Sequence, residues 1–201
     1  MSELRSPEDE VQALRLAAAR ADVNGCWSSA RKLLRHLPPH RALRLVRDFV
    51  SRRLPVFERH QPGVRWPRQF IESIPETGPT DDSEKWPEAE DDFPGPGANT
   101  FTSAVEALWK ASRPEMDEHR RSELLADALD HAVAAERLEH WGTRHPEAWA
   151  LWYQLTSTGL EDPRMVQIQL SIKKDSEAMR VEEEGWLEAA QRLEEALHSS
   201  A

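Results

Sequence analysis

The sequence predicts an all-α protein, an irregular multi-helix bundle of about eight helices with one long acidic loop insertion. Apolar residues recur at the three- and four-residue spacing of a helix face through most of the chain, and no run alternates over the length of a strand. Proline, glycine and capping residues divide the chain into segments of helical length. At 201 residues the chain can bury a sizeable core, so we expect residues 1–201 to form a single helical domain.

The chain begins with signals for two helices. Ser6 can cap the first helix and Pro7 suits its first turn. The Asn-Gly pair at 24–25 is expected to end this helix. A shorter helix should follow over residues 26–37, because the proline pair 38–39 cannot continue it.

A third helix is predicted over residues 40–60, with a kink or break near Pro55. Pro62 and Gly63 then form a turn, and a short helix should occupy residues 67–74. The apolar stripe of the third helix consists of Leu43, Val46, Val50, Leu54 and Phe57.

The stretch 75–99 has a different character. It contains five prolines, three glycines, eight acidic residues and one lysine, and no helical or strand period survives in it. We therefore expect a long acidic loop insertion. Trp86 and Phe93 are its two large apolar residues, and either they dock the loop on the domain or they form a short motif for a partner.

Helical spacing resumes after this stretch, with residues 99–100 expected as the cap. Pro114 is expected to open a longer helix that Gly142 ends. Its stripe over residues 125–138 is rich in alanine, which favours close helix–helix approach. Pro146 and Pro163 each mark the start of a further helix.

The last segment, residues 163–198, carries one apolar column with a seven-residue repeat. A half-polar companion column makes it too narrow for an isolated coiled coil. We expect one long helix, or two helices broken near Asp175 or Gly185, packed along the bundle, and a homodimer through 163–198 stays open as an alternative. The column consists of Met165, Ile172, Met179, Trp186 and Leu193.

Charge is unevenly distributed along the chain, whose net charge is −10. Residues 1–70 contain 14 Lys/Arg and 7 Asp/Glu, whereas residues 71–201 contain 12 and 29. The two halves could complement each other in the fold, the basic half could contact a polyanion, or the acidic half could receive a basic partner. Because the arginines are spread over several helices and the whole chain is acidic, we expect no nucleic-acid binding.

No residue set predicts a reaction. The chain lacks a His-Glu-x-x-His motif, a Cys/His cluster and a glycine-rich phosphate loop, so we expect no enzyme, no cofactor and no metal. Cys26, the single cysteine, is expected to be a packed small residue and fits a reducing compartment. No apolar run reaches the roughly 20 residues of a membrane span, and the polar N-terminus lacks a secretory signal. We expect a cytoplasmic protein.

The corner between the third and fourth predicted helices reads LPVFERHQPGVRWPRQFI over residues 54–71. This string resembles a helical family of immunity proteins from bacterial polymorphic-toxin systems. In that family a helix ends in a Leu-Pro-x-Phe-Glu-like run, and a proline-containing turn leads to an Arg-Pro-Arg-like helix start. The matching residues here are Leu54, Pro55, Phe57, Glu58, Pro62, Pro67, Arg68 and Ile71. The alanine-rich run 126–138 is similar to a later helix of the family. The chain departs from the family at Trp66, in place of an arginine, and in its acidic insertion.

The resemblance implies a non-catalytic protein that binds and neutralises one bacterial toxin. An acidic surface would suit a basic toxin, because complementary charge accelerates the encounter. We therefore expect the contacts in the acidic insertion, with a second patch at 182–184. The expected contact residues are Asp81, Asp82, Glu84, Trp86, Glu88, Glu90, Asp91, Asp92, Phe93, Glu182, Glu183 and Glu184. A helical adaptor or scaffold that acts through protein contacts, with or without self-association, is the alternative.

Overall fold

The computed structural model describes residues 6–74, 92–158 and 162–199, which form nine helices and no strand. The all-α prediction is confirmed. The helices are α1 (Pro7–Ala19), α2 (Val23–Arg35), α3 (Pro39–Glu58), α4 (Trp66–Ser73), α5 (Ala98–Ala111), α6 (Glu118–Arg144), α7 (Pro146–Thr158), α8 (Pro163–Lys174) and α9 (Ser176–His198).

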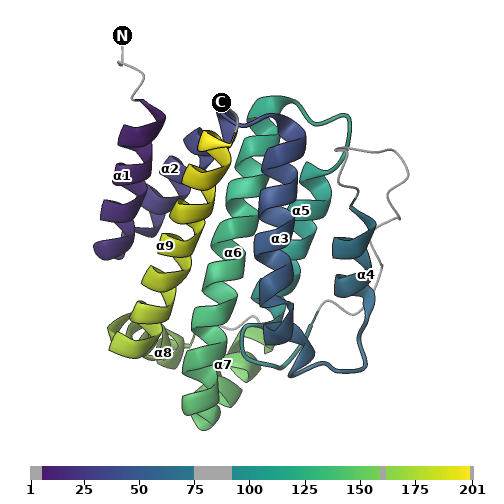
Figure 1. Cartoon of the computed structure of the whole chain (residues 1–201). Coiled ribbons are helices and arrows are strands. Elements are labelled where there is room, and N and C mark those ends of the chain that lie inside the picture. The colour runs from purple at the N-terminus through teal and green to yellow at the C-terminus, as the bar shows by residue number, and fades with distance from the viewer. Residues whose placement is uncertain (1–5, 75–91, 159–161, 200–201) are drawn as a thin grey trace.

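Helix α6 is the central element of the bundle. It packs against α2, α3, α5 and α9, and of these α3 and α9 are the long helices beside it in Figure 1. Helices α1 and α2 cover one side, and α4 lies on the opposite side next to α3 and α5. The buried alanines of α6, as predicted from its small-residue stripe, let neighbouring backbones approach closely.

Helix α6 starts later and ends later than predicted. Its N-cap is Asp117, whose carboxylate accepts a hydrogen bond from the Arg120 amide, so Pro114 lies in the preceding turn. Gly142 lies inside the helix, which continues to Arg144. A Cβ at Gly142 would meet Pro96 Cβ at 2.6 Å. Glycine is therefore present to allow a close tertiary contact, and the prediction that it ends the helix is wrong.

Two further helix boundaries also differ from the prediction. The pair 24–25 was expected to end the first helix, but it lies in the first turn of α2, where the Gly25 amide donates to the Asp22 carboxylate. Helix α5 is capped by Gly97 with φ of 74°, a left-handed conformation that glycine adopts without strain, instead of by residues 99–100. Helix α3 runs through Pro55 to Glu58, so the chain does not break at the proline.

The C-terminal segment forms two helices that meet at Asp175, one of the two break points expected. Gly185 lies inside α9. Most of the predicted apolar column packs within the chain, because Ile172, Trp186 and Leu193 are all buried. The column therefore serves the protein's own core.

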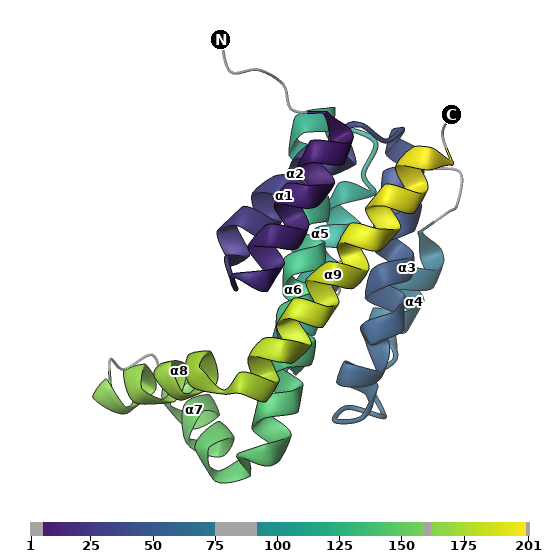
Figure 2. The same cartoon turned by 60° about the vertical axis from the view of Figure 1, so that its left-hand side comes forward.

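Buried residues form one large cluster and one small cluster. The large cluster contains residues of α1–α6 and α9. The small cluster lies where α7 and α8 meet the ends of α6 and α9, around Trp141, Ile168 and Ile172. Figure 2 shows that α7 and α8 project together to one side at this end of the molecule.

Oppositely charged residues of the two halves pair with each other within the fold. Arginines from the first 70 residues pair with acidic residues from α6 and α9, as in Arg15–Glu194 at 2.7 Å and Arg53–Glu188 at 2.9 Å. Arg31 and Arg59 make similar pairs with Glu123 and Glu139. Of the three interpretations of the imbalance, mutual complementation is therefore directly visible in these contacts.

Candidate functional site

The acidic stretch rejoins the domain at a tightly packed junction. Phe93 is buried and its ring meets Phe57 edge-on, with 5.0 Å between centroids. Two glycines, at 95 and 97, then pass so close to other elements that a Cβ on either would clash, at Gly97 with the Ala135 carbonyl oxygen at 2.2 Å. The indole Nε1 of Trp149 donates to the Pro94 carbonyl at 2.7 Å. Helix α7 thus holds the end of the acidic stretch against α6.

Helix α7 is unusually apolar for a helix at the surface. Its sequence, PEAWALWYQLTST, contains one charged residue, Glu147, and Leu155 is its buried residue. Trp149, Trp152 and Tyr153 are only half-buried. Part of each aromatic side chain packs on the small cluster or the junction, and the rest faces solvent.

Asp92 lies beside this aromatic helix. The nearby Tyr153 hydroxyl interacts with its carboxylate, and this interaction raises the pKa of Tyr153. The Asn99 amide donates to the same carboxylate at 3.0 Å, while the Asn99 oxygen accepts from the Phe93 amide at 2.7 Å. An exposed acid and three half-buried aromatic residues therefore form one surface, which we call the α7 face: Asp92, Trp149, Trp152 and Tyr153.

The predicted contact residues of the insertion do not share one environment. Residues 81–91, with Asp81, Asp82, Glu84, Trp86, Glu88, Glu90 and Asp91, lie outside the described part of the chain. Asp92 is exposed, as a contact residue must be. Phe93 is not available to a partner, because Phe57 and the rest of the core already cover it. Phe93 therefore packs on the domain, as the docking alternative expects for this residue, and the partner-binding role of the insertion stays a prediction.

The three residues of the second predicted patch, 182–184, also differ in their burial. Glu182 is buried and its carboxylate lies 2.6 Å from Arg137 Nη1, so it belongs to the α6–α9 interface. Glu183 is half-buried and Glu184 is exposed, because the next positions on α9 turn outward. Glu182 must be removed from the surface patch. A helix cannot present three consecutive residues on one face, and that argument was available from the sequence.

The aromatic residues of α7 were not among the predicted contact residues. The signal was present in the sequence, because two tryptophans and a tyrosine crowd two turns of a helix that has no lysine or arginine. Their half-exposure depends on how α7 sits at the end of the bundle, which is a tertiary property.

Cys26 has the character of a packed residue. It is buried, and desolvation, assisted by the carboxylates of Asp22, Glu182 and Asp130, raises the pKa of its thiol to about 12. The reactive thiolate is therefore disfavoured at neutral pH. Across the described ranges, no group of three or more His, Cys, Asp or Glu is arranged to hold a metal ion. None of the described helices is both long and apolar enough to cross a membrane.

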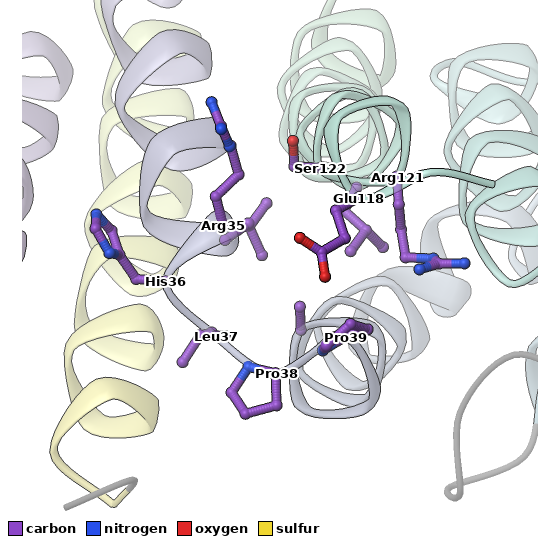
Figure 3. A pocket seen from close by; sticks show the side chains of 11 residues that line it. Arg35, His36, Leu37, Pro38, Pro39, Glu118, Arg121 and Ser122 are labelled. Carbon is purple, nitrogen blue, oxygen red and sulfur yellow. The ribbon is translucent and has the colours of Figure 1, made fainter.

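A cavity of about 240 Å³ lies between the α2–α3 turn and the start of α6. Figure 3 shows the Glu118 carboxylate directed toward its middle and the side chains of Arg35 and His36 directed away. The Arg121 guanidinium also turns away and donates to the carbonyls of Ala111 and Arg113. The cavity is smaller than the roughly 300–1,000 Å³ of typical small-molecule sites. It is a weaker candidate than the α7 face.

In comparisons with known proteins, no family model matches the chain, and neither a curated protein nor a solved structure matches it significantly. The resemblance to immunity proteins stays a prediction from the sequence.

Proposed function

We propose that this protein is a non-catalytic binding protein that neutralises a basic partner, a bacterial toxin, by covering it with an acidic and aromatic surface. The observation that carries the proposal is the hydrogen bond at 2.7 Å from the Trp149 indole Nε1 to the Pro94 carbonyl, which joins the end of the acidic stretch to the α7 face. Six further acids precede Asp92 within residues 81–91.

The chemistry of this surface favours a partner rich in lysine and arginine. Aromatic rings attract cations over their faces, and such contacts contribute about 0.5–2 kcal/mol each. Carboxylates beside the rings add charge-assisted hydrogen bonds and speed the encounter. Tryptophan and tyrosine are also the residues that most often dominate binding energy at protein interfaces. Neither α7 nor the 92–97 junction carries a lysine or arginine that would oppose such a partner.

Binding without catalysis agrees with the remaining side chains. The buried thiol of Cys26 has a pKa of about 12, and the buried carboxylate of Glu182 is already bonded to Arg137. A toxin-neutralising protein needs neither a nucleophile nor a cofactor, because it acts by occupying its partner's surface. The alternative, a helical adaptor or scaffold, is favoured by a different observation, the exposed apolar residues of α8 and α9 discussed below.

The proposal is tested by co-expressing the chain with the product of the adjacent gene and measuring growth, co-purification and affinity. The partner should be toxic alone, harmless with this chain, and bound with an affinity that falls as salt rises. Ala150→Arg with Gln154→Arg places two positive charges on exposed positions of α7 and should weaken binding at least about tenfold through charge repulsion. Gln69→Arg, which adds one positive charge at an exposed position of α4 away from α7, is the control and should bind normally.

A second set of variants tests the acids. Neutralising the six acids should lower affinity and flatten its salt dependence. The substitutions are Asp81→Asn, Asp82→Asn, Glu84→Gln, Glu88→Gln, Glu90→Gln and Asp91→Asn. If the α7 variants and the neutralised insertion both bind as tightly as the unmodified chain, the proposed surface is wrong. If the adjacent product is not toxic, or stays toxic beside this chain, the toxin-neutralising function is wrong.

A further inference from the structure

Most of the exposed large apolar residues in the described chain lie on two consecutive helices, α8 and α9. Four such residues are exposed, and three of them lie on α8 and α9: Val166 at 53%, Leu170 at 41% and Leu187 at 37%. The fourth is Leu16 on α1. Single exposed apolar residues need no explanation, so the case for an interaction surface depends on the charged residues beside these three.

Helix α8 presents a basic and apolar face. Val166 and Leu170 are four residues apart, and Lys173 and Lys174 follow Leu170 by three and four residues, so all four share one side of the helix. All four are exposed, and the opposite side packs Ile168 and Ile172 inward. Within α8 there is no acidic residue, and neither lysine forms an ion pair with any described residue.

Helix α9 presents an acidic face around one leucine. Leu187 has Glu183 four residues and Glu184 three residues before it and Gln191 four residues after it, all on the side that faces away from the core. The nearest described cation to Glu184 is Arg180, whose Nε lies 3.7 Å from its carboxylate on an exposed surface, and such a contact is weak. These carboxylates are therefore available to another positive group.

We propose that the α8 face of one molecule binds the α9 face of a second copy of this chain. Placing Leu170 against Leu187 of the second copy, with the helices antiparallel, sets the remaining contacts. In an antiparallel pair, residues that follow Leu170 face residues that precede Leu187 at the same separation. Lys173 therefore lies over the second copy's Glu184, and Lys174 lies over its Glu183. Val166 lies beside Gln191.

A twofold axis makes both molecules use both faces, because every contact in such a dimer occurs twice. This doubles the buried area, which one helix pair alone would leave small for a stable dimer. The basic partner proposed for the α7 face does not fit α8, because Lys173 and Lys174 would repel it. An acidic surface with a central apolar residue fits, and α9 of the same protein carries one.

Charge-exchange variants test the pairing by sedimentation and light scattering over a wide concentration range. The unmodified chain should form a dimer of twice 23.0 kDa. Lys173→Glu with Lys174→Glu should weaken the dimer about a hundredfold, because four screened ion pairs become repulsive. Glu183→Lys with Glu184→Lys should do the same. An equimolar mixture of the two variants should restore the dimer, since each α8 then faces an α9 of opposite charge.

An apolar substitution has a matched control within the chain. Leu170→Asp should abolish the dimer, while Leu16→Asp, at the more exposed position on α1, should leave it intact. Circular dichroism verifies that each variant stays helical.

A monomeric unmodified chain, a dimer unaffected by the lysine exchange, or a mixture that does not reassociate overturns the proposal. Binding of α8 to anionic vesicles by a chain that stays monomeric would also overturn it, in favour of a membrane surface. None of these readouts involves the basic partner, so this proposal and the proposed function succeed or fail separately.

Discussion

Arg144 and Asp175 form an ion pair that closes the base of the α7–α8 pair, with Nη2 of the arginine 2.7 Å from Oδ1 of the aspartate. Arg144 is the last residue of α6, and Asp175 lies between α8 and α9. The same carboxylate accepts a hydrogen bond from the Ala178 amide and faces His145 Nε2 at 3.3 Å. One side chain therefore caps α9 and joins the two points where α7 and α8 leave the bundle.

Asp175→Asn is expected to loosen the α7–α8 pair without unfolding the bundle. Asparagine keeps the N-cap of α9 but loses the charge that holds Arg144, which should cost about 1–2 kcal/mol of unfolding free energy. Amide hydrogen exchange should accelerate in α7 and α8 and stay slow in the central part of α6. Glu177→Gln, a neighbouring exposed partner of Arg144, should cost less than about 0.5 kcal/mol. Equal effects of the two substitutions would contradict the central role of Asp175.

The same carboxylate predicts a pH dependence of stability. Partial burial acts to raise the pKa of Asp175, but hydrogen bonds from Arg144, the Ala178 amide and His145 outweigh it and lower the pKa from 3.8 to about 2. Because the folded state holds the proton less tightly than the unfolded state, this contribution is present above pH 4 and is lost as the pH falls toward about 2. Urea titrations should show the difference in stability between the unmodified chain and Asp175→Asn shrinking across that range. A constant difference would show that the charge of Asp175 is not the stabilising element.

Gly142→Ala is expected to destabilise the protein although alanine is the better helix former. A Cβ at this position would lie 2.6 Å from Pro96 Cβ and 3.1 Å from Trp149 Cε3, so the junction under the acidic stretch would have to open. The overpacking should cost about 1–3 kcal/mol, which exceeds the gain in helix propensity of about 1 kcal/mol. Gly63→Ala is the control, since a Cβ there meets nothing within 4 Å. Thermal melts in which both variants behave alike would refute the close contact at Gly142.

Local signals in the sequence predicted the fold class and several helix starts. Pro146 and Pro163 each open a helix as expected, because proline is suited to the first turn whatever surrounds it. The break at Asp175 was also foreseeable as one of two alternatives. These features depend on residues within a turn of each other.

The errors arise where a residue's role depends on a distant partner. Gly142 was taken as a helix end, but it is glycine because Pro96 approaches it from another segment. Glu182 was placed on the surface, but Arg137, 45 residues earlier in the chain, pairs with it in the interior. Phe93 could equally have faced a partner or the core, and only its contact with Phe57 decides between them. Composition and spacing contain no information on these pairings.

Cys26 is expected to resist alkylation in the folded protein. Burial and the nearby carboxylate of Asp22 raise the pKa of its thiol to about 12, so almost no thiolate exists at pH 8. Iodoacetamide should react with it at least about a hundredfold more slowly in native buffer than in denaturant, where the pKa returns to about 8.5. Mass spectrometry over time measures both rates. Rapid labelling of the native protein would contradict the buried placement of the thiol.

Removing the Arg53 side chain should lower the unfolding free energy more than removing an exposed arginine, because Arg53 lies inside the α3–α6–α9 interface. Its side chain is 5% exposed and reaches Glu188 at 2.9 Å and Glu136 at 3.0 Å, with its guanidinium 3.8 Å from the centre of the Phe49 ring. Arg53→Ala removes the charged bonds to Glu188 and Glu136 and opens a void over Phe49, at a cost of about 1.5–3 kcal/mol, while Arg192 still pairs with Glu188 at 2.8 Å. Arg52→Ala, at a side chain 63% exposed and 3.9 Å from Glu188, should cost less than about 1 kcal/mol. Denaturant unfolding of the two variants compares them directly, and similar midpoints would show that Arg53 does not join the three helices.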